Sequence, residues 1–272
     1  MSADQEHLFP DQAALCTAAA RELLTVLAEA VRDRGVASAV LTGGGTGTGI
    51  LSAMATLAAE QLSTEQRSGP DDEVPLPDWS RVHVWWGDER FLAAGHPDRN
   101  EVQADAALLT TLINDHGLPE VNVHRMPVAE TGLMTEAADT YAAELICHTH
   151  VDPGPDPRLP VFDVVLLGLG PDGHVASLFP HHPGPEETGA TVIAVADSPK
   201  PPPLRLSMTA EALSTARRLW FVVAGADKQE AVSATRALRA DQGIDPVRWP
   251  GSVVSGQLST TWWLDQAAAG EG

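Results

Sequence analysis

The segment FDVVLLGLG, residues 162–170, is the most apolar run in this chain of 272 residues. An uninterrupted hydrophobic run predicts a central strand of a parallel sheet, because helices cover both faces of such a strand. Turn-forming residues follow at once in PDG, residues 171–173. The run therefore indicates an α/β protein, and it places the residues after it at the carboxyl end of a buried strand.

Strand-like and helix-like segments alternate on both sides of this run. Short apolar segments predict further strands at 36–41, 81–86, 121–126, 191–196, 204–208, 218–223 and 260–264. Amphipathic or Ala- and Leu-rich segments predict helices at 11–34, 48–66, 100–114, 133–149 and 227–240. Asp11 is the expected N-cap of the first helix and Gly35 its stop. The alternation predicts one three-layer, Rossmann-like α/β domain over residues 1–272, a mostly parallel sheet with helices on both faces.

Three informative loops each follow a predicted strand. They are residues 42–49, 87–100 and 168–182. In open α/β sheets, ligands bind beyond the carboxyl ends of the strands. We therefore expect the three loops to converge on one cleft.

The composition limits the partners of the protein. The formal net charge is −20, a field that repels nucleic acid and anionic membrane surfaces. There is neither a run of 18 uncharged apolar residues nor a basic, apolar signal peptide at the N-terminus. Cys16 and Cys147 lie far apart, which predicts two free thiols in a reducing cytosol. We expect a cytoplasmic protein with no nucleic-acid or membrane partner, in which an anionic ligand needs local donors.

The first loop is the glycine-rich segment LTGGGTGTG, residues 41–49. Glycines let backbone amides approach a phosphate at the start of a helix, and threonines add hydroxyl donors. The dinucleotide fingerprint and the P-loop motif both fail, because Ile50 stands where each needs another residue. The loop favours a phosphate on a small molecule, although a plain strand-to-helix turn is the alternative. The candidate donors are Thr42, Gly43, Gly44, Gly45 and Thr46.

The second loop contains WWGDERF, residues 85–91. The rigid donor fork of Arg90 can bind a carbonyl oxygen or a phosphate. Asp88 and Glu89 can orient this arginine or a neighbouring base. The alternative is a surface ion pair at the loop entrance.

The third loop is GLGPDGHVASLFP, residues 168–180. It places His174 at the mouth of the central strand, where we expect a short helix to begin. A histidine there can act as a general base near neutral pH, with Asp172 or a backbone carbonyl fixing its tautomer. A polar surface histidine is the alternative.

Two further segments supply cations. SPKPPPLRLSM, residues 198–208, presents Lys200 and Arg205 on an extended, proline-rich loop. Lys228 is expected in the first turn of a helix, where a cation opposes the helix dipole and a bound anion would offset the cost. The alternative for the proline-rich segment is a rigid connection at the sheet edge, and the alternative for Lys228 is a solvated lysine.

The sequence does not predict a metal site. The motifs G-x-S-x-G and H-E-x-x-H do not occur. His148 and His150 are two residues apart and so do not share a helix face. The adjacent pair His181 and His182 is interpreted as loop surface.

Together these segments resemble the 6-phosphogluconolactonase family over about residues 38–264. The most specific segment is 168–180, whose G-x-G-x-D-G-H core is shared with the related glucosamine-6-phosphate deaminases. The SLFP that ends this segment is lactonase-like, whereas the deaminases resemble A-F-N-E-P there. GDER, SPKPPPLR and AGADKQ strengthen the match. The resemblance implies the sugar-phosphate isomerase/deaminase version of the α/β fold.

The resemblance also implies an activity, the hydrolysis of 6-phospho-D-glucono-1,5-lactone in the oxidative pentose phosphate pathway. It maps the water-activating base to His174 and the arginine of DER to Arg90. The glycine-rich loop, Arg205 and Lys228 map to substrate and phosphate binding. A strained lactone needs only a base and an oxyanion donor set. The expected partner is therefore the phosphorylated sugar lactone, no cofactor or metal is implied, and the protein is expected as a monomer or small homo-oligomer.

Two positions depart from the family pattern, Gly47 where proline is common and Arg99 where serine is common. Two other functions stay open. A glucosamine-6-phosphate isomerase/deaminase would need a base at Asp88 and an acid just after DGH, and SLFP lacks that acid. A non-catalytic sugar-phosphate-binding protein usually carries a DNA-binding module, for which the chain has neither length nor a basic patch.

Overall fold

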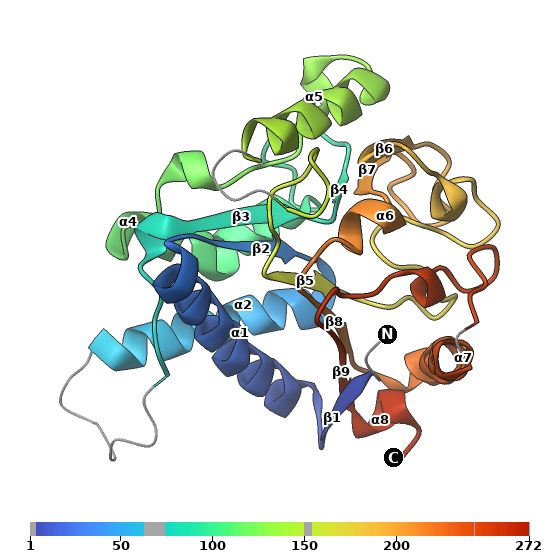
Figure 1. The fold of residues 1–272 in the computed structure, drawn as a ribbon, viewed down its shortest axis with the longest axis horizontal. Coiled ribbons are helices and arrows are strands. Elements are labelled where there is room, and N and C mark those ends of the chain that lie inside the picture. The colour runs from blue at the N-terminus through green and yellow to red at the C-terminus, as the bar shows by residue number, and fades with distance from the viewer. Residues whose placement is uncertain (1–3, 63–73, 150–153, 242, 272) are drawn as a thin grey trace.

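The computed structural model describes residues 4–62, 74–149, 154–241 and 243–271. Within these ranges the main sheet is parallel throughout. Its strands are β1 (Gln5–Phe9), β2 (Ala37–Leu41), β3 (Val82–Trp86), β5 (Val164–Leu167), β8 (Arg218–Val223) and β9 (Ser259–Asp265). They lie in the order β1-β9-β8-β5-β2-β3 (Figure 1). The apolar run therefore forms an interior strand, β5, whose residues are all buried as predicted.

A smaller antiparallel sheet stands beside the main one. It consists of β4 (Asp88–Arg90), β6 (Val192–Val195) and β7 (Arg205–Met208), in the order β4-β7-β6. Residues 88–90 had been expected as part of a loop. They form a strand because β7, distant in the sequence, offers them a hydrogen-bonding edge.

Helices cover the main sheet on both sides. The long helices are α1 (Gln12–Arg34), α2 (Gly44–Leu62), α5 (Met134–Cys147) and α7 (Gln229–Ala240), and the short ones are α3 (Asn100–Ala104), α4 (Thr110–Asp115), α6 (Ala210–Leu213) and α8 (Gln266–Ala269). The α1 and α2 helices pack together on one side of β2 and β3, and α5 lies on the other side with the small sheet (Figure 1). The three-layer α/β arrangement is confirmed. None of the helices in the described ranges is long and apolar enough to cross a membrane.

The local signals for the first helix are confirmed. The Asp11 side chain accepts a hydrogen bond from the backbone N–H of Ala14 at 2.8 Å and so caps α1. Gly35 ends the helix in the left-handed conformation, with φ at 79°. Of the two cysteines, Cys16 is buried and Cys147 is exposed, and both are free thiols.

The predicted strand at 121–126 is wrong. Glu120–Asn122 forms a 3₁₀ turn, and Val123 makes a single parallel bridge to Val84. The Asn122 side-chain amide donates to the carbonyls of Ser80 and Val82. It thus occupies acceptors at the edge of β3 that a full strand would need.

Other boundaries also differ from the predicted ones. The helix expected from residue 48 already begins at Gly44, and the helix expected at 100–114 is interrupted by a π-helical turn over Asp105–Leu109. β1 was not predicted, because an edge strand with exposed residues carries no apolar run. Residues 63–66 of the expected second helix, and His150, lie outside the described residues.

Candidate active site

A cleft lies at the carboxyl ends of β2, β5 and β8, beside the small sheet. This is where an α/β sheet binds ligands. The three predicted loops do converge here, since each contributes residues to the cleft wall. The predicted site residues that line it are Thr42, Gly43, Gly44, Gly45, Thr46, Asp88, Arg90, His174, Arg205 and Lys228. Lys200, predicted only as a cation of the proline-rich loop, and Asn100, which was not predicted, line it as well.

Asp172 lies directly behind His174. The distance from His174 Nδ1 to Asp172 Oδ1 is 2.6 Å. Because a carboxylate can only accept, Nδ1 carries the proton and Nε2 keeps a free lone pair. The imidazole also rests against the Phe179 ring, with centroids 4.7 Å apart. The arrangement fixes both the tautomer and the orientation that a general base needs.

His174 does not begin a helix, contrary to the prediction. Residues 171–180 form consecutive turns instead. Gly173 and Ala176 both have positive φ values, 81° and 48°, which interrupt right-handed helical geometry on either side of the histidine. The turn closes through the backbone hydrogen bond from Gly170 N–H to the His174 carbonyl at 2.9 Å.

Lys200 adds a positive charge to the histidine–aspartate pair. Its Nζ lies 3.2 Å from Asp172 Oδ1 and 3.1 Å from His174 Nδ1. Since Nδ1 already donates to Asp172, the ammonium donates to the carboxylate as well. Burial alone would raise the pKa of Asp172, but the hydrogen bond from His174 and the charges of His174 and Lys200 outweigh it and hold that pKa well below its usual range. Asp172 therefore stays ionised and keeps holding the imidazole N–H.

Antiparallel pairing brings two arginines side by side. In the register of β4 and β7, Arg90 stands opposite Arg205. Like charges directly across a strand pair repel. Burial lowers the pKa of Arg205, the nearby carboxylate of Asp88 raises it, and the charge of Arg90 lowers it further. Arg90 Nε is buried and lacks a hydrogen-bond partner. A donor without a partner beside a second cation is suited to an anionic or carbonyl oxygen in the cleft.

Asp88 is engaged by groups other than Arg90. Its Oδ2 accepts the Ser177 hydroxyl at 2.6 Å and lies 3.9 Å from Arg205 Nη1. The Arg90 guanidinium donates to the Asp98 carbonyl. Asp88 thus helps to hold Arg205, whereas the sequence had suggested that it orients Arg90 or a base.

The Arg205 guanidinium donates hydrogen bonds to the backbone of the proline-rich loop. Its Nε donates to the carbonyl of Pro202, and Nη2 donates to those of Lys200 and Pro201, all at 3.2–3.3 Å. Nη1 donates to the Ser177 hydroxyl at 3.5 Å and lies 3.9 Å from Asp88 Oδ2. Arg205 therefore fixes the proline-rich loop, and it also lines the cleft.

Sequence reasoning missed Asn100 and suggested another role for Glu89, the orientation of Arg90 or a base. Glu89 is buried and accepts the backbone N–H groups of Asn100 at 2.7 Å and Glu101 at 2.9 Å, which caps the first turn of α3. Burial raises the pKa of Glu89 to about 7. The Asn100 amide donates to the Asp88 carbonyl at 2.9 Å, and its Oδ1 is buried without a partner. The signal for Asn100 was weak, since only the atypical Arg99 drew notice to this segment.

The contacts of Arg99 account for an arginine at a position where serine is common. The side chain is fully buried and pairs with Glu101 at 2.7 Å. It also donates to the carbonyls of Met126 at 2.7 Å and Arg90 at 3.1 Å. Arg99 therefore ties together the backbone behind Arg90 and does not line the cleft.

The glycine-rich loop passes directly into α2. Gly44 adopts a φ of 80°, a conformation that favours glycine. A Cβ on Gly43 would stand 1.9 Å from Asn100 Oδ1, and a Cβ on Gly47 would stand 2.4 Å from the Thr42 carbonyl oxygen. The departure from the family pattern at Gly47 thus has a steric reason, because a proline at this position would also carry a Cβ. Residues 44–47 of the first turn of α2 line the cleft, and the first N–H groups of a helix have no partner within it, which suits an anion site.

Lys228 lies at the end of a 3₁₀ turn, Ala226–Lys228, immediately before α7. Its Nζ pairs with Asp227 at 2.8 Å, and about a quarter of its side chain is exposed. The cation thus stands at the N-terminus of a helix, close to its predicted position. It reaches the same cleft as the first turn of α2.

Comparisons with known proteins agree with this geometry. The family described as glucosamine-6-phosphate isomerases/6-phosphogluconolactonase matches residues 10–263. A 6-phosphogluconolactonase of Streptomyces coelicolor is 42% identical over 264 residues, covering 96% of this chain and 92% of the relative. The solved 6-phosphogluconolactonase of Trypanosoma brucei has a TM-score of 0.75 at 24% identity, over 98% of each chain. A monomeric glucosamine-6-phosphate deaminase has a TM-score of 0.70 at 18% identity, over 98% of this chain and 100% of the other. These two structures share the fold.

Proposed function

The chain belongs to the family of glucosamine-6-phosphate isomerases and 6-phosphogluconolactonases, and we propose that within it the protein is a 6-phosphogluconolactonase. Its substrate is 6-phospho-D-glucono-1,5-lactone and its product 6-phosphogluconate, a step of the oxidative pentose phosphate pathway. The relative that is 42% identical over nearly the whole chain carries that name. The observation that carries the proposal is the held imidazole of His174 beside Arg90 in one cleft.

The proposed reaction begins with His174. Its Nε2 takes a proton from water, and the water oxygen bonds to C1 of the lactone. Asp172 stabilises the imidazolium that results, because it remains ionised and accepts the Nδ1 proton. The imidazolium then returns the proton to the ring oxygen as the C1–O5 bond breaks. The open acid loses its own proton to solvent.

Arg90 is proposed to stabilise the negative charge that develops on the carbonyl oxygen. Its buried Nε–H has no other partner. A donor that is already in place strengthens its interaction as the oxygen becomes an anion, and so lowers the barrier. The Arg90 guanidinium does not have to be reoriented for the reaction, because it already donates a hydrogen bond to the Asp98 carbonyl.

The opposite part of the cleft is proposed to hold the phosphate. The first turn of α2 supplies backbone amides from Gly45 and Thr46, and Lys228 supplies a cation. Arg205, which also lines the cleft, adds a second positive charge. These local donors counter the repulsion that a protein of net charge −20 exerts on a phosphorylated substrate.

A substrate assay tests this function. The purified protein should accelerate the hydrolysis of 6-phosphoglucono-δ-lactone, with the spontaneous reaction subtracted, and leave the unphosphorylated lactone nearly untouched. Release of ammonia from glucosamine 6-phosphate would instead identify the deaminase. Binding of either sugar phosphate without turnover would identify a non-catalytic binding protein.

Removing the phosphate cations should weaken substrate binding. We expect Lys228→Ala and Arg205→Ala each to lose roughly 1.5 to 3 kcal/mol, the range for hydrogen bonds to charged groups. The loss should appear mainly in KM, because the phosphate does not react and is bound equally in the ground and transition states.

The matched control for Lys228 is Asp227→Asn, which removes the ion-pair partner and keeps the cation. It should not raise KM. Arg205→Ala also frees three carbonyls in the proline-rich loop, so a fall in kcat beside the rise in KM is expected for that variant alone. If KM is unchanged in both alanine variants, neither residue binds the phosphate.

The remaining features of the proposal concern the protein as a whole. We propose a single lactonase domain over residues 1–272, acting in the cytoplasm as a monomer or small homo-oligomer. The free thiols support a reducing compartment.

A further inference from the structure

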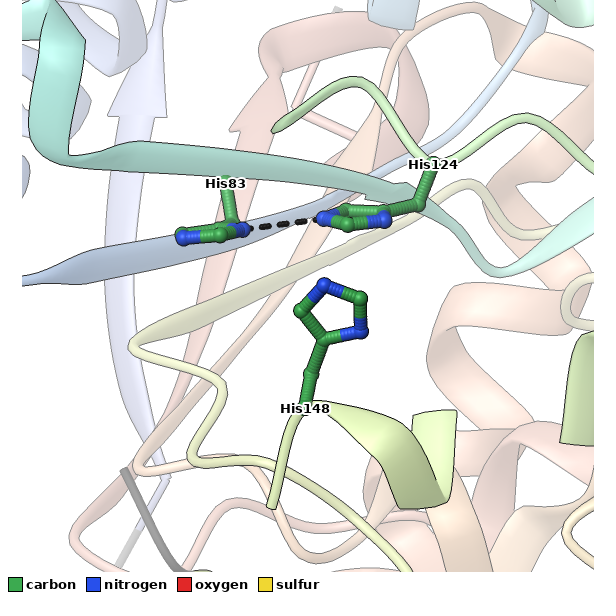
Figure 2. Close-up of side chains that lie close together, drawn as sticks. All are labelled: His83, His124 and His148. Carbon is green, nitrogen blue, oxygen red and sulfur yellow. Dashed lines mark hydrogen bonds between the residues drawn. The ribbon is translucent and has the colours of Figure 1, made fainter. Parts of the chain in front are cut away.

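Three histidines from separate segments meet on the side of the main sheet that faces α5. His83 is the second residue of β3, His124 follows the 3₁₀ turn at Glu120–Asn122, and His148 is the C-cap of α5. The ligating nitrogens of this three-histidine cluster all lie within 4.8 Å of one another. Figure 2 shows the rings of His83 and His124 edge to edge, with one nitrogen of His148 pointing between them. The cluster is distinct from the active site, which lies beyond the carboxyl end of β3.

The hydrogen bonds around the cluster fix the tautomers of two rings. His124 Nδ1 lies 2.7 Å from Glu144 Oε1, and His148 Nδ1 lies 2.9 Å from the Glu144 carbonyl oxygen. Both partners are acceptors, so both Nδ1 atoms carry the proton. The Nε2 lone pairs are therefore available on the side of the cluster interior. Metal-binding histidines in proteins almost always donate their other ring N–H to a carboxylate or a backbone carbonyl in this way.

The spacing of the nitrogens is close to that of a metal site. His83 Nδ1 and His124 Nε2 are 2.9 Å apart. Zinc–nitrogen bonds of about 2.0–2.1 Å in a tetrahedron place two ligand nitrogens about 3.3–3.4 Å apart. His83 Nδ1 and His124 Nε2 must therefore move apart by about half an ångström. No other two ligating nitrogens need to approach each other by more than about 1.5 Å.

The surroundings hold the rings of His124 and His148 in place and favour the uncharged form of His83 and His124. The Trp85 ring stacks on His124, with centroids 3.6 Å apart, and meets His148 edge-on at 5.3 Å. Burial, together with the neighbouring histidines, lowers the pKa of His83 to about 4, and burial lowers that of His124. His83 and His148 remain partly open to solvent, which gives an ion a way in.

We propose that His83, His124 and His148 bind one Zn²⁺ ion through Nδ1, Nε2 and Nε2, respectively, with water in the fourth position. Three histidines and a water form a ligand set that zinc takes in proteins, whereas Mg²⁺ and Ca²⁺ prefer oxygen. In the metal-free state His83 Nδ1–H donates to His124 Nε2. On binding, His83 moves its proton from Nδ1 to Nε2 through solvent. The ion joins β3, the segment after it and the end of α5.

The test is calorimetric titration of the full-length protein, stripped with EDTA, with Zn²⁺. The wild type should bind one equivalent, and its melting temperature should rise with the Zn²⁺ concentration. Glu144→Gln removes the carboxylate that holds His124 and should weaken binding by about 10- to 100-fold. His83→Asn and His148→Gln each remove a ligand and should weaken binding more than Glu144→Gln does.

Two control variants separate this cluster from other histidines. His181→Gln combined with His182→Gln removes the adjacent surface pair, and His174→Asn removes the active-site imidazole. Both should bind Zn²⁺ as the wild type does. The proposal is wrong if the wild type binds no Zn²⁺, if His83→Asn and His148→Gln bind it normally, or if either control abolishes binding. The melting temperature in EDTA shows whether each variant is folded. His83→Asn changes a residue that is partly open to solvent, so it keeps the test valid if another variant does not fold.

Discussion

Replacing His174 by asparagine should lower kcat for lactone hydrolysis by roughly 10²- to 10⁴-fold, the usual contribution of a general base. Asparagine keeps a polar group of similar size, and it removes the lone pair that takes the proton from water. KM should change little, because the proposed phosphate contacts come from α2 and Lys228 and are untouched. Stopped or continuous assays of lactone hydrolysis give both constants once the spontaneous rate is subtracted.

Folding of the His174→Asn protein should be close to that of the wild type. The side chain lies at the cleft and is partly exposed, so its loss leaves no large cavity.

Only a neutral imidazole can accept a proton, so the catalysed rate of the wild type should also fall towards acid pH. A folded asparagine variant with nearly normal kcat would exclude His174 as the base, and Asp88 or Glu89 would be the next residue to test.

Adding a single methyl group at Gly170 should have an effect of similar size. The imidazole folds back over this glycine, so a Cβ at residue 170 would stand 1.9 Å from His174 Nδ1 and 2.4 Å from Asp172 Oδ1. Real Cβ atoms do not approach other atoms so closely, and the histidine–aspartate pair must separate or move. We expect Gly170→Ala to lose about 100-fold or more in kcat, because catalysis by a base depends on its position.

Gly168→Ala is the matched control. It lies two residues earlier in the same segment, and a Cβ there meets only Thr42 Oγ1, at 4.0 Å. Melting temperatures of both variants show whether the turn still folds. If Gly170→Ala hydrolyses the lactone as fast as Gly168→Ala does, the orientation of His174 by Asp172 is not needed for the reaction.

Much of the fold followed from local patterns. The run at 162–170 predicted a buried parallel strand, and Asp11 and Gly35 marked the ends of α1. The small sheet did not follow from such patterns, because residues 88–90 become a strand only when β7 lies beside them. The edge strand β1 also carried no apolar signal, because most of its residues are exposed, and it becomes a strand by pairing with β9.

The candidate site divides in the same way. Asp172 and His174 are two residues apart in one turn, so the sequence could pair them. Lys200 was noticed as a cation, but only the tertiary structure brings its ammonium to Asp172. The cap that Glu89 provides for α3 was not predicted, and Asn100 was missed, because both roles depend on how two segments pack.

The sequence by itself determined the class of fold, the strand on which the site is built, and the histidine that follows it. These depend on hydrophobic periodicity and turn chemistry, which act between neighbours in the chain. The tertiary structure alone decided that Arg90 stands opposite Arg205, and that His83 and His124 meet His148. Such contacts are set by strand register and by the packing of a helix on a sheet, which depend on the balance of many distant interactions and leave no pattern in either segment.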